Sequence, residues 1–142
     1  TDIAQLSEQI QDFPSGYNTM LGERGINLSG GQKQRATLAR ALARDPLILA
    51  LDDALSAVDP QTEAKILEDL RSVTKRRTSF IISHRVSAVM HADEILVLER
   101  GKLVERGAHA ELINSGGTYA RLLRHQILEE DLESRLATTP GD

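Results

Sequence analysis

An unbroken apolar run that ends in two aspartates constrains the fold of this chain more than any other segment. Residues 47–51 read Leu-Ile-Leu-Ala-Leu, and Asp52 and Asp53 follow directly. A continuous apolar run of this length is typical of a parallel strand buried on both faces. In open α/β sheets, ligands bind beyond the carboxyl ends of the strands. The segment therefore predicts a buried strand with carboxylates at a ligand-binding edge, although a helix cap or a turn would also account for the two aspartates.

Helical and strand patterns alternate along the rest of the chain, which predicts an α/β sheet. The predicted helices cover residues 3–11, 31–44, 59–73, 86–90, 109–113 and 119 onward, and the predicted strands cover residues 47–51, 80–83, 95–98 and 102–105. Asp59 followed by Pro60 has the sequence of a helix N-terminus, because Asp caps helices well and Pro suits the first helical position. Arg100-Gly101 between two strand patterns predicts a hairpin turn.

Residues 27–35 read Asn-Leu-Ser-Gly-Gly-Gln-Lys-Gln-Arg, a pattern suited to contact with a phosphate group. Glycines let the main chain approach a ligand closely. The free N–H groups at a helix start, together with the helix dipole, favour an anion there. Ser29 could add a hydroxyl donor and Gln32 an amide donor. The alternative is that Ser-Gly-Gly is only a flexible loop that caps a helix.

A third segment, residues 79–84, reads Ser-Phe-Ile-Ile-Ser-His and places a histidine at the end of another predicted strand. A single histidine can be purely structural. Here, however, three separate ends of strands or helices carry residue types suited to phosphate, metal or proton chemistry.

Composition narrows the possible functions. The chain has 142 residues, 40% of them apolar, which suits one domain with a core. The aromatic content of 3% and the net charge of −4 argue against a nucleic-acid partner. The absence of cysteine excludes disulfides and thiolate chemistry. No apolar run in the sequence approaches the roughly 18 residues expected of a membrane span.

Together these segments resemble the C-terminal half of the nucleotide-binding domain of an ABC transporter of the exporter type, over roughly residues 1–125. Leu28-Ser29-Gly30-Gly31-Gln32 matches the signature motif of that family. The strand ending at Asp52 matches Walker B, and residues 56–59 (Ser-Ala-Val-Asp) match the D-loop. His84 matches the switch histidine. The segments Gly22–Gly25 and Gly101–Gly107 also resemble exporters.

The resemblance implies an α/β fold that is part of a P-loop NTPase (RecA-like) parallel sheet. Residues 1–45 would end the α-helical signature subdomain. Residues 46–116 would belong to the RecA-like part, with Walker B, the D-loop and the switch histidine. Residues 117–142 would form a C-terminal helix and tail.

The resemblance also implies ATP sites shared between this domain and a second nucleotide-binding domain. Leu28, Ser29, Gly30, Gly31 and Gln32 would contact ATP held by the partner, with Ser56 and Asp59 of the D-loop at the same interface. Asp52 would hold Mg²⁺, through water, at this chain's own site. Asp53 and His84 would be the catalytic residues there.

Asp53 departs from the family pattern, which has Glu at the catalytic carboxylate. Aspartate is one methylene shorter, and a misplacement of about 1 Å can lower a rate on the order of a hundredfold. We therefore expect this chain's own site to hydrolyse ATP slowly. Such a residue occurs in exporters made of two unlike halves, so the expected partner is a non-identical chain.

The sequence contains no Gly-x-x-x-x-Gly-Lys-Ser/Thr stretch, so the phosphate-binding P-loop is missing. We interpret the chain as a fragment that binds ATP poorly alone. The transmembrane domain is expected in the same polypeptide, with this part at the cytoplasmic face of the inner membrane.

Three functions remain open from the sequence: the ATPase part of an exporter, an ATP-dependent clamp without hydrolysis at its own site, and a soluble ATPase of the same superfamily.

Two surface segments also have open interpretations. Lys75-Arg76-Arg77 is interpreted as a solvated basic turn. Leu128, Leu132 and Leu136 form an apolar stripe on the tail, which could pack on its own domain or pair with a partner helix. Asp131 and Arg135 could pair along that helix, and residues 137–142 are expected to fray.

Overall fold

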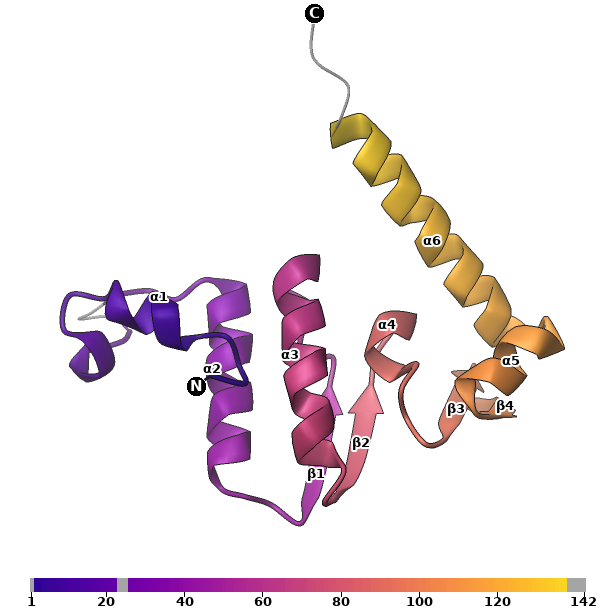
Figure 1. Cartoon of the computed structure of the whole chain (residues 1–142), viewed down its shortest axis with the longest axis horizontal. Helices are drawn as coiled ribbons and strands as arrows, with labels where there is room; N and C mark the ends of the chain where they lie inside the picture. Colours follow the sequence, from indigo (N-terminus) through magenta and orange to yellow (C-terminus); the bar gives the residue numbers. More distant parts are fainter. Residues whose placement is uncertain (1, 23–25, 138–142) are drawn as a thin grey trace, which may run out of the picture. The chain divides into compact units, whose positions relative to one another are not determined.

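The computed structural model describes residues 2–22 and 26–137, and the chain divides into two units, Thr1–Ile82 and Ser83–Asp142. The first unit contains α1 (Ser7–Gln11), η1 (Gly16–Asn18), α2 (Gly30–Ala43), β1 (Ile48–Asp52), α3 (Pro60–Thr74) and β2 (Thr78–Ile82) (Figure 1). The second contains α4 (Val86–Val89), β3 (Ile95–Glu99), β4 (Lys102–Gly107), α5 (His109–Ser115) and α6 (Thr118–Ala137). The predicted α/β class is confirmed. The division at residues 45 and 116 stays a prediction.

The first unit is built on a parallel pair of strands joined by a helix. β1 and β2 run in register from Ile48 opposite Thr78 to Asp52 opposite Ile82. α3 connects them, as a parallel pair requires a crossover. Both strands therefore end at the same edge, where Asp52 and Asp53 lie.

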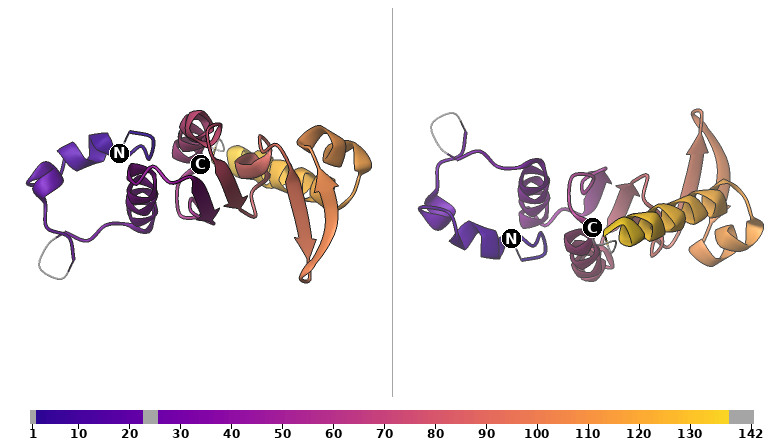
Figure 2. Two further views of the ribbon diagram at one scale, coloured as in Figure 1. Left: turned by 90° about the horizontal axis from the view of Figure 1, so that it is seen from below. Right: turned by 90° about the horizontal axis from the view of Figure 1, so that it is seen from above.

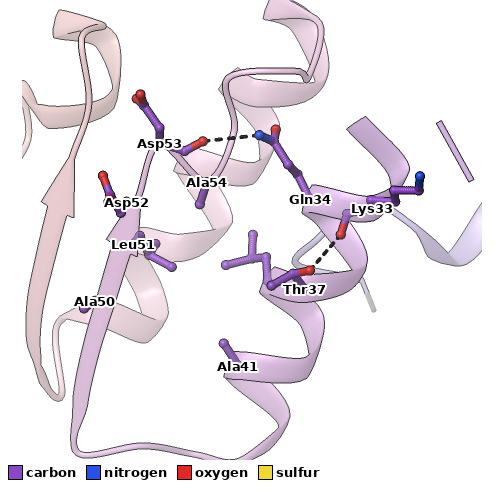
Figure 3. Close-up of a pocket in the computed structure, with 10 residues that line it drawn as sticks. Lys33, Gln34, Thr37, Ala41, Ala50, Leu51, Asp52, Asp53 and Ala54 are labelled. Atoms are coloured by element: carbon purple, nitrogen blue, oxygen red, sulfur yellow. Dashed lines mark hydrogen bonds between the residues drawn. The ribbon is translucent and has the colours of Figure 1, made fainter. Parts of the chain in front are cut away.

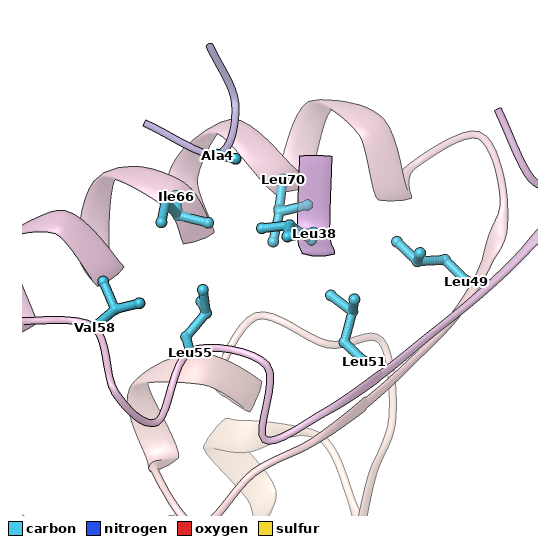
Figure 4. Close-up of a cluster of buried hydrophobic side chains, with 8 residues drawn as sticks. All are labelled: Ala4, Leu38, Leu49, Leu51, Leu55, Val58, Ile66 and Leu70. Carbon is cyan, nitrogen blue, oxygen red and sulfur yellow. The ribbon is translucent and has the colours of Figure 1, made fainter. Parts of the chain in front are cut away.

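The core of this unit contains apolar residues from the segment before α1, from α2, β1 and α3, and from the loop between β1 and α3. Figure 4 shows the buried cluster, which consists of Ala4, Leu38, Leu49, Leu51, Leu55, Val58, Ile66 and Leu70. Ile66 and Leu70 are spaced four apart on α3, so they lie on one helical face. Both side chains are buried, so this face of α3 points into the core.

The prediction that residues 47–51 form a strand buried on both faces is wrong for the described residues. Burial alternates along β1: Leu49 and Leu51 are buried, whereas Ile48 is 65% exposed. On β2, Phe80 is 58% exposed. Side chains alternate between the two faces of a strand, and here the helices cover only one of them.

Arg77 does not belong to a solvated basic turn. Its side chain is 11% exposed and donates hydrogen bonds to the carbonyl oxygens of Val73 (2.9 Å) and Pro46 (3.2 Å). It also pairs with the carboxylate of Asp45 at 2.9 Å. Arg77 thus joins the end of α3 to the segment that enters β1, while Lys75 and Arg76 are exposed as predicted.

The second unit packs helices against an antiparallel hairpin. β3 and β4 pair as an antiparallel hairpin around Arg100-Gly101 (Figure 2). The register of the pair shifts between Val97 and Leu98. The predicted hairpin is therefore confirmed. The buried cluster of this unit consists of Val86, Ile95, Val97, Leu112 and Tyr119.

The carboxylate of Glu105 on β4 fixes the start of α6. It accepts hydrogen bonds from the backbone N–H groups of Thr118 (3.1 Å) and Tyr119 (2.7 Å). A carboxylate at this end of a helix satisfies free donors and complements the helix dipole. This contact holds the long helix on the hairpin.

The predicted C-terminal helix is present, and the predicted pair between Asp131 and Arg135 forms at 3.5 Å. Leu128 and Leu132 of the stripe are exposed, an arrangement that leaves both interpretations of the stripe open. Among residues 2–22 and 26–137, no helix has the length and apolar character needed to cross a membrane. The fraying expected past Ala137 and most of the segment Gly22–Gly25 lie outside the described residues.

Candidate nucleotide-binding site

The N-terminus of α2 is held by a reciprocal cap between Ser29 and Gln32. The Ser29 hydroxyl oxygen accepts from the Gln32 backbone N–H at 3.2 Å, and the Gln32 side-chain oxygen accepts from the Ser29 N–H at 2.8 Å. This is the capping box expected of Ser followed three residues later by Gln. Capping, raised above as an alternative to phosphate contact, is thus present. A capped, ordered helix start is also what an anion site needs, because the remaining N–H groups stay fixed.

Gly31 lies directly against the D-loop segment. A Cβ at residue 31 would stand 2.6 Å from the carbonyl oxygen of Ala57, closer than Cβ atoms approach other heavy atoms in folded proteins. At Gly30, a Cβ would stand 3.5 Å from the Cβ of Ala57, an ordinary contact. The second signature glycine is therefore required by packing, whatever ligand the helix start binds.

Gln34 ties α2 to the same segment through both ends of its amide. Its nitrogen donates to the Ser56 hydroxyl at 2.8 Å and to the Asp53 carbonyl at 3.3 Å, while its oxygen accepts from the Ala57 N–H at 2.8 Å. The structure thus brings the predicted signature residues and the predicted D-loop residues together. The sequence reasoning did not single out Gln34; its place one turn after Gly31 is the only signal that could have suggested it.

Asp52 and Asp53 sit at the carboxyl edge of the parallel pair. They line one end of a cavity of about 350 Å³ between α2 and β1, whose other lining residues include Lys33, Thr37 and Ala41. Figure 3 shows the Asp53 carbonyl directed at Gln34, with its carboxyl group pointing away. The predicted site carboxylates therefore lie at the rim of this cavity, and the signature residues 28–32 do not line it.

The backbone of Asp53 is in the left-handed region, with φ of +44°. Asp tolerates this conformation better than most residues. Its N–H donates to the Ile82 carbonyl at 2.9 Å, which closes the edge between the two strands. The side chain at residue 53 is thus aimed by an uncommon backbone conformation that the sequence pattern did not predict.

Asp59 caps α3, as predicted. Its carboxylate accepts from the Thr62 N–H at 2.9 Å. That hydrogen bond lowers the pKa of Asp59 below its usual value, and the nearby Arg35 guanidinium lowers the pKa slightly further.

Arg35 is the buried charged residue closest to the signature helix start in sequence. It donates to the Gln5 carbonyl at 2.5 Å, the Gln9 side-chain oxygen at 2.7 Å and the Gly31 carbonyl at 3.4 Å. Gln9 also accepts from Gln32 at 3.3 Å. This network fixes α1 and the chain before it onto α2. Arg35 was missed because an arginine in a helical pattern is usually solvent-exposed.

His84 follows β2 and belongs to the second unit, with an exposed side chain. The segment that carries it turns into α4, and the Arg85 N–H donates to the Ser83 hydroxyl oxygen at 3.0 Å.

The donor set for a metal ion is small. Among the described residues, no group of three or more His, Asp or Glu side chains could hold a metal. Mg²⁺ commonly takes only one or two protein carboxylates and completes its shell with water and substrate phosphates. Asp52, with Asp53 beside it, fits that pattern.

Comparison with known proteins identifies the fold. A family model described as ABC transporter matches residues 2–56. A solved bacterial Atm1-family ABC exporter with ATP bound aligns over 89% of this chain with a TM-score of 0.82 and 44% identity, and the chain covers 22% of that structure. This chain is part of an ABC transporter nucleotide-binding domain. Domains of this kind are ATPases.

Curated relatives agree with that assignment. The ABC transporter ATP-binding protein YknU of Bacillus subtilis is 56% identical over 119 residues, which is 84% of this chain and 20% of the relative. The probable multidrug resistance ABC transporter ATP-binding/permease protein YheI of the same organism is 50% identical over 125 residues, or 88% of this chain and 21% of the relative. This chain therefore spans about a fifth of the length of these relatives.

Proposed function

We propose that this chain works within an ABC export transporter, where ATP-dependent closure of two nucleotide-binding domains drives substrate translocation. The observation that carries the proposal is the packing of Gly31 on Ala57, supported by the hydrogen bonds from Gln34. It joins the capped start of α2 and the D-loop into one continuous surface. Such a surface suits a second nucleotide-binding domain that presents ATP between the two.

In this arrangement Ser29, Gly30 and Gly31 contact the terminal phosphate of ATP held by the partner domain. Backbone N–H groups at a helix N-terminus attract negative charge, as a triphosphate supplies. Leu28 and Gln32 shape the same surface, and Ser56 and Asp59 lie at the interface. Asp52 holds Mg²⁺ through water at this chain's own nucleotide, where Asp53 and His84 act on the attacking water.

A charge test at residue 29 separates phosphate contact from capping. Asp and Asn are both good N-caps, so Ser29→Asp and Ser29→Asn should preserve α2. In the full-length transporter, Ser29→Asp should abolish ATP-dependent closure because its carboxylate repels the phosphate, whereas Ser29→Asn should retain much of it. Equal ATPase rates and equal closure in the two variants would contradict phosphate contact at residue 29.

The shorter carboxylate at residue 53 favours slow hydrolysis at this chain's own site and a non-identical partner with the faster site. An ATP-dependent clamp is the limiting case, in which this site holds nucleotide without turnover. Asp53→Glu tests both, measured with the partner's site disabled. We expect the rate to rise by up to about a hundredfold, the order of effect of a 1 Å displacement.

Because residue 53 has a positive φ, the stability of the Asp53→Glu variant must be checked in parallel. Asp53→Asn is the matched control, since Asn also tolerates this conformation but cannot act as a base. An Asp53→Glu variant that folds normally and turns over no faster than the parent would refute the geometric explanation.

The position in the cell follows from the same proposal. The relative YheI is named as an ATP-binding/permease protein, which places both functions in one polypeptide for that protein. We infer a transmembrane domain in the polypeptide that contains this chain, with the nucleotide-binding domain at the cytoplasmic face of the inner membrane. Protease protection of a tag inserted after Gly101, at the hairpin turn, would test this placement.

A further inference from the structure

Gln126 on α6 holds the segment that carries His84 from both sides. Its side-chain nitrogen donates to the His84 carbonyl at 2.6 Å, and its side-chain oxygen accepts from the Val86 N–H at 2.9 Å. A carbonyl can only accept and an N–H can only donate, so the two partners fix the orientation of the amide. One side chain thus pairs with the main chain of two residues that lie about 40 positions earlier.

The apolar contacts of the same helix support this pairing. Val86 is 3% exposed and packs in the cluster that includes Tyr119, with Leu123 against it. Tyr119, Leu123 and Gln126 follow one another at spacings of four and three, so they share one face of α6. That face packs beside α4, and Gln126 stands where the apolar contacts give way to the turn at His84.

The consequence is a fixed backbone at His84. An imidazole can act in proton transfer only if it is held at hydrogen-bond distance from its target. The local bond from Arg85 to Ser83 spans only two residues. The bonds from Gln126 tie that turn to a long helix, which is itself fixed to the hairpin by Glu105.

We propose that Gln126 is a positioning residue for ATP hydrolysis, acting through His84, and that the docking of α6 is therefore required for full turnover. The inference rests on the role given to His84 in the proposed function. Gln126 contacts neither nucleotide nor water in this scheme. Its loss should lower kcat and leave the KM for ATP nearly unchanged, because nucleotide binding uses other residues.

The test compares Gln126→Met and Gln126→Glu in the full-length transporter. Met has a similar length and removes both hydrogen bonds. Glu keeps an acceptor for the Val86 N–H but cannot donate to the His84 carbonyl when ionised. We expect kcat to fall by about tenfold or more in both variants, because Met removes both hydrogen bonds and Glu places a carboxylate oxygen against the His84 carbonyl. A displacement of about 1 Å is enough for such losses. Glu129→Ala, at an exposed position of the same helix, is the control and should retain the parent rate.

A double-variant cycle distinguishes positioning from general destabilisation. If Gln126 acts through His84, Gln126→Met should add no further loss of kcat in a His84→Ala background. A further tenfold loss there, or an unchanged kcat in Gln126→Met alone, would overturn the inference while the proposed function stands.

A second readout does not depend on turnover. Hydrogen exchange of the Val86 amide should accelerate at least about tenfold in Gln126→Met, because the amide loses its acceptor. If His84→Ala leaves hydrolysis unchanged, the catalytic role of His84 fails and the inference fails with it. The exchange rate then still reports whether Gln126 holds this turn, so the two failures can be told apart.

Discussion

Gly31 and Ala57 approach so closely that a Cβ on residue 31 would lie 2.6 Å from the Ala57 carbonyl oxygen. The contact places the second glycine of the signature segment on the backbone of the D-loop. A residue that family resemblance assigns to phosphate binding therefore has an independent structural role within its own chain. Variants at this position combine both effects, which must be separated before ATPase rates are interpreted.

The first prediction concerns the two neighbouring glycines. Gly31→Ala should lower the free energy of unfolding of the nucleotide-binding domain by about 1–3 kcal/mol, because a backbone atom must move to admit the methyl group. Gly30→Ala should stay within about 0.5 kcal/mol of the parent, since its Cβ meets only an ordinary contact. Denaturant unfolding of the two variants provides the measurement. Equal stability of the two variants would show that the Ala57 backbone can move away from residue 31 without a loss in the free energy of unfolding.

Gln34→Ala should loosen the D-loop. The change removes the acceptor of the Ala57 N–H and the donor to the Ser56 hydroxyl, and a hydrogen bond of this kind contributes about 0.5–1.5 kcal/mol. Hydrogen exchange at Ala57 should accelerate in step with the loss of stability. Lys33→Ala, at the exposed preceding position, should change neither quantity. Unaltered exchange at Ala57 in the Gln34 variant would contradict the proposed connection.

Arg77 should contribute more through its bonds to backbone carbonyls than through its ion pair. Arg77→Ala should lower the free energy of unfolding by on the order of 2 kcal/mol, since it leaves the Pro46 and Val73 carbonyls without a charged donor. Asp45→Asn should cost less than about 1 kcal/mol, because the Asp45 side chain is 90% exposed and such pairs are weak. Thermal unfolding provides the measurement, and losses of stability of similar size in the two variants would contradict this ranking.

The cap at Asp59 predicts a pH dependence of stability. The Thr62 N–H lowers the pKa of the Asp59 carboxyl in the folded state below the ordinary value of 3.8. The stabilisation is therefore complete above that value and is lost as the pH falls through the lower, folded pKa. Asp59→Asn keeps the cap without the charge, so the parent should be more stable at pH 6 and the difference should shrink below about pH 3.8. Unfolding curves that differ by a constant amount down to pH 3 would argue against a charge contribution.

Much of the fold could be predicted because its signals are local. The predicted helix over residues 31–44 is observed as Gly30–Ala43, and the cap at Asp59 with Pro60 behind it is present. The hairpin around Gly101 likewise follows from residues within a few positions of the turn. These features depend on periodicity and on hydrogen bonds between residues three or four apart, which a sequence displays directly.

The prediction of a strand buried on both faces was wrong because an apolar run shows that its side chains are hydrophobic. It does not show whether another element packs over each face of the strand. Burial at Ile48 depends on what packs over that face, and the described residues place helices on the other side only. For the same reason Arg77 was assigned to solvent, although a backbone carbonyl at Pro46, 31 residues earlier, lies within reach of its guanidinium.

By itself, the sequence determined the order of the elements, the caps of α2 and α3 and the segments that we propose for the nucleotide chemistry. The tertiary structure alone decided which residues hold those segments in place: Gln34 on the D-loop, Glu105 on the start of α6 and Gln126 on the turn at His84. The reason is physical. A glutamine or glutamate has the same composition and periodicity whether it is solvated or bonded to a distant main chain, and only the folded path of the chain brings its partners within 3 Å.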